Sequence, residues 1–424
     1  MCVRLPRLPR RLRSSPLGVA TACLVAGAAL GVTATMAVAA FFSTTSSSGS
    51  TFATASSFAS TCSTGGVDWI TGLEPGYTST GIPFTSTAGV VNVESAVKRT
   101  GGHSVKVQKG AGSIGYARKS GFPINGNTHV LHFGFRVAAL PTGDVTFAVL
   151  DQINSDLLLK YRASSQTLTL QWGTDPAVEA LSTLQANTWY RIELKAITST
   201  NPITAEWRID GVAQTSISKA ETGGAIGTIH LGSGNTTEAP AYTAYYDDIV
   251  HSKVASDYPF GDLHVSALRP NENGAHVNPG HFQHDDGTAI NATTWTWLDD
   301  AAMFGGVDEV RQVTADTSSY LEFGWENPAE SCVLGIQAYA NSGSVGSSGN
   351  SVKMSVFDGT TETVIHSGAT GCGNCLSMRS AYVTPATSSW TAARLNGLVL
   401  RLGYQRDATP VTQWGAAMLE YAAR

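Results

Sequence analysis

Short segments in which apolar and polar residues alternate recur through the middle of the chain, and this period of two restricts the fold most. Segment 188–195 shows the pattern clearly. One face of the expected strand carries Tyr190, Ile192 and Leu194. The other face carries Trp189, Arg191, Glu193 and Lys195. Such alternation is typical of a strand with one face in a core. Residues 66–258 contain no convincing helical apolar period, so the sequence predicts an all-β fold.

Further strands are expected upstream of this segment, and turn residues separate them. They lie near 103–107, 130–137, 145–150, 157–161 and 168–172. Short strands with turns roughly every 8–12 residues are typical of a β-sandwich or barrel. The sequence therefore predicts a sandwich over about 66–258.

Three phrases carry a resemblance to a known family. Segments 187–194, 206–211 and 245–250 resemble, in order and spacing, the second half of a laminin-G-like, or concanavalin-A-like, jelly-roll domain. Residues 72–76, Gly-Leu-Glu-Pro-Gly, resemble a Gly-Phe-Glu-x-Gly phrase found near the start of related domains. The resemblance spans about 190 residues and implies a jelly-roll β-sandwich, a fold used mostly to hold sugars and proteins.

A second β-rich region follows a boundary expected at 258–262. A hairpin is predicted across 357–360, and the last strands are predicted within 390–404 and 414–421. This region, 262–424, resembles the C-terminal module that follows a jelly-roll domain in many phage and prophage structural proteins. We expect a second β-sandwich domain here.

The N-terminal segment has the layout of an export signal. Residues 1–40 contain five arginines and no acid, and 17–40 is an uncharged run ending near the small residues Ala37 and Ala39. The following residues resemble the signal region of secreted fibre-type and camelysin-like proteins. The run is also long enough to span a bilayer, so both a cleaved signal peptide and a retained membrane anchor are open. Residues 41–65 are rich in Ser, Thr and Gly and are expected to form a disordered stalk.

The charge balance excludes one class of partner. The formal net charge is −5, and without the five arginines of residues 1–40 it becomes about −10. A lysine-poor acidic surface lacks the clustered cations that phosphates require, so no nucleic-acid partner is expected. The protein is expected outside the cell or at its surface, with membrane contact only through an uncleaved N-terminal segment.

The jelly-roll resemblance implies a structural calcium ion. In related domains, the last strand supplies an Asp near the N-terminal Glu-x-Gly turn. Carried over, this points to Asp248 or Asp247 with Glu74, and carboxylates are suitable ligands for Ca²⁺. The alternative is that one Asp caps a turn or pairs with an Arg, while the other is solvated.

A ligand-binding face is expected on the polar side of segment 188–195. Trp189 lies opposite the apolar face and shares its side with Arg191 and Glu193, so these three residues are candidates for carbohydrate contacts. The alternative for any single aromatic residue on a sandwich strand is burial in the core. The sandwich-glucanase signature Glu-x-Asp-x-x-Glu on one strand is absent, so no catalytic residue is predicted.

Four cysteines lie outside the export segment. Cys372 and Cys375 have the Cys-x-x-Cys spacing of a redox or metal motif, but no second such pair is present. In an exported chain a structural disulfide is favoured over a metal site, and Cys332 is expected to pair with Cys372 or Cys375.

These observations lead us to expect a secreted, non-catalytic recognition protein that binds carbohydrate or another surface, such as a surface protein. One alternative is a structural component of a surface fibre or virion, which would form a homo-oligomer or fibre. A second alternative is a polysaccharide lyase or glycoside hydrolase.

Overall fold

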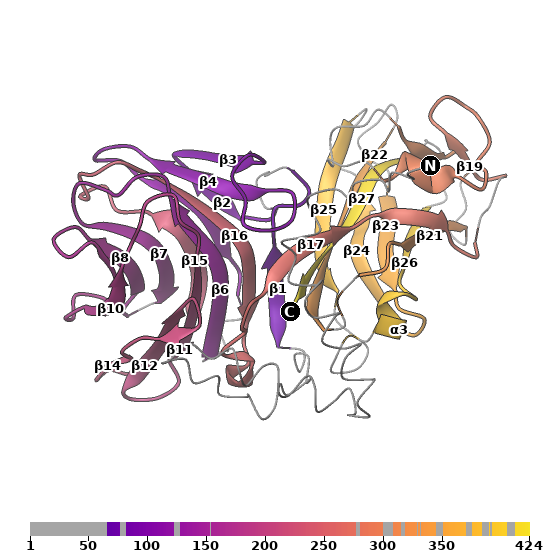
Figure 1. Cartoon of the computed structure of the whole chain (residues 1–424). Helices are drawn as coiled ribbons and strands as arrows, with labels where there is room; N and C mark the ends of the chain where they lie inside the picture. The colour runs from indigo at the N-terminus through magenta and orange to yellow at the C-terminus, as the bar shows by residue number, and fades with distance from the viewer. Residues whose placement is uncertain are drawn as a thin grey trace, which may run out of the picture. The chain divides into compact units, whose positions relative to one another are not determined.

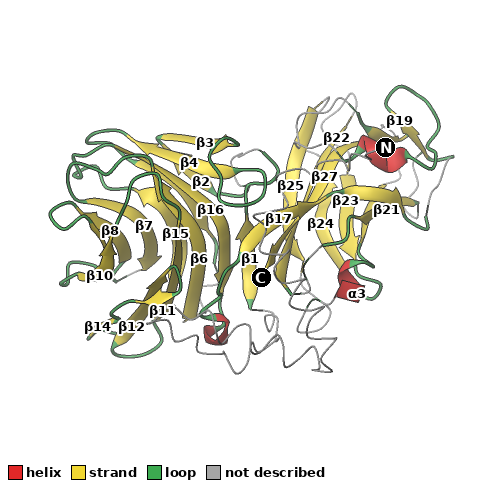
Figure 2. Cartoon of the chain, viewed as in Figure 1, coloured by secondary structure: helices red, strands yellow, loops and turns green. Residues whose placement is uncertain are grey.

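The computed structural model describes most of the chain beyond Ser60, and these described residues are almost entirely strands and loops (Figure 2). The described ranges are 66–76, 82–122, 128–152, 154–276, 280–299, 308–314, 319–328, 330, 332–344, 351–369, 375–383, 390, 392–404 and 412–424. The export segment and the expected stalk lie outside them. Among the described residues, no helix has the length and apolar character that crossing a membrane requires.

The first sandwich contains a nine-stranded antiparallel sheet. Its main path runs β13-β12-β11-β6-β16-β4-β3, with β1 added beside β16 and β14 beside β12. These strands are β1 (Val67–Thr71), β3 (Val90–Glu94), β4 (Ser104–Lys109), β6 (Thr128–Val137), β11 (Tyr190–Ile197), β12 (Ile203–Ile209), β13 (Val212–Ala213), β14 (Ile217–Lys219) and β16 (Tyr242–Ser252).

The second layer of this sandwich is a seven-stranded antiparallel sheet in the order β10-β9-β8-β7-β15-β5-β2. Figure 1 shows β7, β8 and β15 side by side within it. The strands are β2 (Ser86–Ala88), β5 (Gly115–Ser120), β7 (Val145–Gln152), β8 (Leu157–Arg162), β9 (Thr167–Trp172), β10 (Val178–Thr183) and β15 (Ile226–Ser233).

The core of the first sandwich is built from the alternate residues of both sheets. Phe133 and Phe135 on β6 belong to one cluster with Phe147 on β7, and the Phe135 and Phe147 rings lie 4.7 Å apart. Trp172 and Trp207 are each 1% exposed. Burial of such large apolar side chains is the main force that holds two sheets together.

The second sandwich also has two antiparallel sheets. One has the order β19-β20-β27-β22-β25, with β17 beside β27, and the other has the order β18-β21-β26-β23-β24. The strands are β17 (His264–Leu268), β18 (Pro270–Asn273), β19 (Phe282–His284), β20 (Val310–Gln312), β21 (Tyr320–Trp325), β22 (Val333–Ser344), β23 (Ser351–Phe357), β24 (Glu362–Ala369), β25 (Cys375–Val383), β26 (Val399–Tyr404) and β27 (Thr412–Ala423). The short helices are η2 (Ala255–Asp257), η3 (Thr294–Trp297) and α3 (Ala392–Leu395).

The predicted fold class, a jelly-roll β-sandwich followed by a second β-sandwich, is confirmed. Segment 206–211 ends in a tight hairpin turn, because Asp210 and Gly211 have φ values of 51° and 82°, as a type I′ turn requires. The hairpin expected at 357–360 joins β23 to β24.

Segment 390–404 differs from the prediction, since α3 precedes the strand that begins at Val399. The proposed domain limits stay a prediction, and Thr61–Arg424 forms one compact unit.

Candidate functional site

The outer face of the seven-stranded sheet carries a row of polar and small apolar side chains. Neighbouring strands bring His230, Val149 and Leu158 opposite one another across β15, β7 and β8. A bulge between Thr146 and Ala148 breaks the alternation of β7, so that Ala148 points into the core while Thr146 and Val149 both face outward. Bulges commonly redirect side chains at functional sites.

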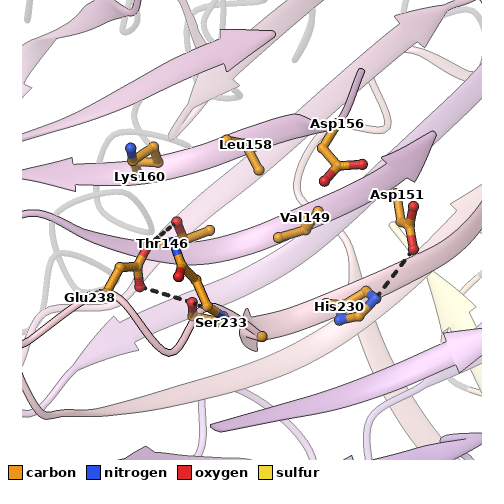
Figure 3. A pocket seen from close by; sticks show the side chains of 11 residues that line it. Thr146, Val149, Asp151, Asp156, Leu158, Lys160, His230, Ser233 and Glu238 are labelled. Carbon is orange, nitrogen blue, oxygen red and sulfur yellow. Dashed lines mark hydrogen bonds and ion pairs between the residues drawn. The ribbon is translucent and has the colours of Figure 1, made fainter. Parts of the chain in front are cut away.

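This face is hollowed into a cavity of about 420 Å³, which we call the trough (Figure 3). It is lined by the polar residues Asp151, Asp156, Lys160, His230, Asn235 and Glu238, with Val149 and Leu158 on its apolar floor. A second hollow of about 480 Å³ shares Asp151 and Asp156 and continues to Thr174 and Lys219. The two hollows together form an extended polar surface of the size that a small-molecule or oligomeric ligand occupies.

Glu238 is held in a fixed position at one end of the trough. Its Oε1 accepts a hydrogen bond from Thr146 Oγ1 at 2.5 Å, and its Oε2 accepts one from Ser233 Oγ at 2.8 Å. Its backbone oxygen accepts a hydrogen bond from the buried Lys109 Nζ at 2.6 Å. Figure 3 shows the Thr146 and Ser233 contacts from neighbouring strands. A carboxylate held by two hydroxyls needs no reorganisation to meet a ligand.

His230 lies at the other end, beside Asp151. Its Nε2 is 3.8 Å from Asp151 Oδ2, which is too long for a hydrogen bond. Its ring packs edge-on against Tyr116, with ring centroids 5.0 Å apart. Burial lowers the pKa of His230 from its usual value, so the imidazole is neutral at pH 7. Within the described part of the chain, neither ring nitrogen has a hydrogen-bond partner, and both nitrogens are buried.

Asp151 and Asp156 form a carboxyl pair between the two hollows. Asp156 Oδ1 accepts a hydrogen bond from the backbone nitrogen of Gln152 at 3.2 Å. Burial raises the pKa of Asp156, and the charge of Asp151 together with a side-chain hydrogen bond to it raises that pKa further. Asp156 therefore keeps its proton to a higher pH than an exposed aspartate does.

The structure places the predicted ligand residues Trp189, Arg191 and Glu193 at a different sheet. Arg191 and Glu193 lie on β11 of the nine-stranded sheet, and Trp189 directly precedes that strand. Glu193 is fully buried and accepts a hydrogen bond from the backbone nitrogen of Gly261 at 2.8 Å. Arg191 Nη1 lies 3.2 Å from Asp262 Oδ1. Two of the three side chains thus contact the chain's own segment 258–262, and their ligand role stays a prediction.

Asp247 and Asp248 are buried and surrounded by donors. Asp248 Oδ2 accepts a hydrogen bond from Arg99 Nη1 at 2.6 Å, and its Oδ1 accepts bonds from Thr100 Oγ1 and from the Val265 nitrogen. Asp247 Oδ2 accepts a bond from the Arg99 nitrogen at 2.7 Å. Burial, followed by the charge of Asp248, raises the pKa of Asp247 to about 9.

The contacts of these two carboxylates suit a guanidinium and N–H or O–H donors better than a calcium ion. Glu74, the third expected ligand, accepts the Gly102 nitrogen at both carboxylate oxygens, at 2.9 and 2.8 Å. Backbone N–H groups aimed at carboxylates repel a cation. No group of three metal-binding side chains occurs within the ranges that the structure describes. Calcium at these residues therefore stays a prediction, and it would compete with Arg99 for Asp248.

The structure describes the bonding of one of the three cysteines in the disulfide prediction. Cys332 is disulfide-bonded. Cys372 and the side chain of Cys375 lie outside the described residues, so the pairing stays a prediction.

The comparisons with known proteins concern the fold. No family model matches the chain, and no curated protein matches its sequence. A solved cellulose induced protein, Cip1, is similar over 44% of this chain and 97% of its own, with 16% identity and a TM-score of 0.35. An alginate lyase of polysaccharide lyase family 7 is similar over 39% of this chain and 82% of its own, with 12% identity and a TM-score of 0.30. A Trypanosoma rangeli sialidase is similar over 38% of this chain and 27% of its own, with 14% identity and a TM-score of 0.29.

These neighbours are β-sandwich proteins related to carbohydrates, and they correct one prediction. The sequence led us to expect no enzymatic activity, because a one-strand glucanase signature is absent. The sialidases and the alginate lyase are enzymes, so the absence of a one-strand signature does not exclude activity, and the expectation does not stand. The physical reason is that residues on several different strands can form a site on a sheet face, so no one-strand motif is needed.

Proposed function

We propose that the trough binds a carbohydrate chain along the outer face of the seven-stranded sheet. The observation that carries this proposal is the open polar hollow of about 420 Å³, continued by a second hollow that shares two of its lining residues. The proposed site is formed by β7, β8 and β15 with the loops that follow them.

The chemistry of the lining suits sugar hydroxyls. Carboxylates accept hydrogen bonds from them, and the Lys160 ammonium and the Asn235 amide nitrogen can donate to them. The exposed edges of Val149 and Leu158 offer apolar surface to the C–H groups of a sugar ring. Few but fixed polar groups over an apolar floor are typical of ligand sites.

Cleavage of the bound chain is the second candidate. It is favoured by the shifted titration of Asp156 and His230 within one hollow, since perturbed pKa values cluster at functional sites. A carboxyl that keeps its proton to a higher pH and a neutral imidazole in the same hollow would offer an acid and a base to a bound chain.

The wider setting is part of the same proposal. Export through residues 1–40 would deliver the protein to extracellular polysaccharides, in keeping with the laminin-G resemblance of the first sandwich. Assembly into a surface fibre or virion, suggested by the phage-module resemblance, is the competing role. Electron microscopy of the purified protein would reveal ordered filaments if assembly were the main role.

A trough-filling substitution tests the binding proposal. Val149→Trp places an indole on the trough floor, while Val90→Trp makes the same change on the nine-stranded sheet, where Val90 is 49% exposed. We expect polysaccharide affinity electrophoresis to show retardation of the wild type and of the Val90→Trp variant, and at least a tenfold loss of affinity for Val149→Trp, which corresponds to about 1.4 kcal/mol.

Equal retardation of both variants would overturn the location of the site, and no retardation of any protein on a broad polymer panel would overturn carbohydrate binding. The same incubations are assayed for new reducing ends and for the ultraviolet absorbance of unsaturated ends. Release of either product by the wild type but not by Val149→Trp would establish cleavage.

A further inference from the structure

We infer that the trough selects uncharged polysaccharides and discriminates against polymers of uronic acids. This inference rests on the proposed function, because it names the chemical class of the chain that the same trough binds.

The first argument is the charge of the lining. Asp151, Asp156 and Glu238 are carboxyls, and among the described residues that line the trough Lys160 is the single lysine or arginine. His230 adds no positive charge at pH 7, because its imidazole is neutral there. The lining of the trough therefore carries a net negative charge even when Asp156 retains its proton. A carboxylate on every sugar ring would add repulsion at each bound unit.

The second argument is that two nearby cations, Arg162 and Lys219, have acidic partners of their own, while Arg118, which pairs with His230 across β5 and β15, does not line the trough. Arg162 Nη1 lies 2.5 Å from Glu179 Oε1. Lys219, which lines the adjoining hollow, has Nζ 3.0 Å from Glu221 Oε2. A polyanion would have to displace these partners to gain a salt bridge. A polyanion that recruited either cation would lose part of its gain to the displaced acid.

The third argument concerns reach. At 0.1 M salt, exposed charges interact over about 10 Å before screening becomes strong, and this distance exceeds the width of one sugar ring. Asp151 and Asp156 stand between the two hollows, so a chain that occupies both passes directly over the carboxyl pair. The overall acidity of the protein, with a net charge of −5, repels polyanions in the same direction.

A polymer pair that differs only in this charge tests the inference. A soluble β-glucan and the product of its C6 oxidation, a polyglucuronate with the same backbone, are compared by affinity electrophoresis and calorimetry at low salt. We expect the wild type to bind the neutral polymer at least tenfold more tightly. The difference should shrink as salt is added, because screening weakens the repulsion.

A matched pair of double variants locates the effect. Asp151→Asn with Asp156→Asn removes the carboxyl pair, and Glu206→Gln with Glu272→Gln removes two acids that do not line the trough. Both sets change the net charge equally. We expect the polyglucuronate to gain at least fivefold in affinity for the first set relative to the second.

Each outcome has a defined meaning. If the wild type binds the polyglucuronate as tightly as the neutral glucan, or if added salt does not reduce the difference, the inference is wrong while the proposed function stands. If the trough variant and the control variant respond equally, the carboxyl pair is not the cause and the inference is wrong. If neither polymer nor any other glycan binds, the proposed function itself fails. The salt series on the wild type decides the question even if the trough variant does not fold.

Discussion

At the scale of single residues, Arg99 pairs with one buried and one exposed acid. Its side chain is 16% exposed, and Nη1 lies 2.6 Å from Asp248, whose side chain is fully buried. Nη1 also donates to the backbone oxygen of Leu263 at 2.7 Å, and Nη2 donates to Asp262 at 2.6 Å. One guanidinium thus connects the buried Asp248 of β16 to the segment that leads into β17.

Replacement of Arg99 by Met should therefore destabilise the protein strongly. The change leaves Asp248 buried without its cation, and breaking a buried pair in this way typically costs about 3–5 kcal/mol. We expect a clear drop in the thermal midpoint, measured by circular dichroism.

The control uses the other partner of the same guanidinium. Asp262→Asn removes an acid that is 77% exposed, and an exposed pair contributes only about 0–1 kcal/mol. If both substitutions lower the midpoint equally, the burial of Asp248 is not what makes Arg99 important. Calcium added to the Arg99→Met variant tests the predicted ion directly: a calcium-specific recovery of the midpoint would show that these carboxylates can hold it.

At the scale of elements, β1 and β27 meet at a buried carboxyl. Glu420 on β27 is 0% exposed. Its Oε1 accepts hydrogen bonds from the Glu74 nitrogen at 2.8 Å and the Gly72 nitrogen at 3.1 Å, and its Oε2 accepts one from Tyr339 Oη at 2.7 Å. These contacts connect the end of the first strand to the second sandwich.

Glu420 should make stability depend on pH. Burial raises its pKa from 4.5 to about 8, and the nearby charge of Glu74, whose own pKa burial raises to about 7, adds to the effect. The folded protein thus binds this proton more tightly than the unfolded chain. The stabilisation is complete below pH 4.5 and is lost as the pH rises through about 8.

Glu420→Gln should remove most of this dependence. The amide keeps an acceptor for the backbone nitrogens and carries no charge. We expect the variant to exceed the wild type at pH 9 by on the order of 2 kcal/mol or more, measured by urea unfolding, with a much smaller difference at pH 5. Glu206→Gln, on β12 with a side chain that is 47% exposed and paired with Lys195, is the control and should leave the pH profile nearly unchanged. An identical pH profile for Glu420→Gln and the wild type would contradict the argument.

Sequence reasoning predicts elements well where local pattern decides them. Tyr190, Ile192 and Leu194 are buried as their alternation indicates, because a period of two directly specifies one face of a strand. Glu193 is different. Its polar identity predicts an exposed face, but Gly261, far along the chain, covers it. Contacts of such long sequence separation leave no local pattern.

The trough is missed by sequence reasoning for the same reason. Val149, Leu158 and His230 come from three strands, and their meeting depends on strand order. The bulge between Thr146 and Ala148 also reverses which residues of β7 face outward, so a simple alternation assigns Ala148 and Val149 to the wrong faces. One signal was available, since strand 145–150 breaks strict alternation.

At the scale of the whole molecule, the two sandwiches share a third apolar cluster. It combines Ile70 and Val250 of the first sandwich with Val265, Leu334 and Ala422 of the second, and all five are at most 2% exposed. Separate domains are usually connected by exposed, polar linkers with few crossing contacts. A buried apolar cluster with the hydrogen bonds of Glu420 beside it is the opposite situation, so unfolding of one sandwich exposes a surface of the other.

We therefore expect residues 61–424 to unfold in one cooperative transition, although sequence reasoning divides them at 258–262. Differential scanning calorimetry measures this directly. Ile70→Ala, which removes apolar volume from the shared cluster, should lower the single midpoint, because truncation of a buried Ile costs about 2–5 kcal/mol. Val90→Ala, at an exposed position of the first sandwich, should change it little. Two resolved transitions, with Ile70→Ala shifting only the one that belongs to the first sandwich, would show instead that the shared cluster does not couple the sandwiches and that the division at 258–262 is a true domain boundary.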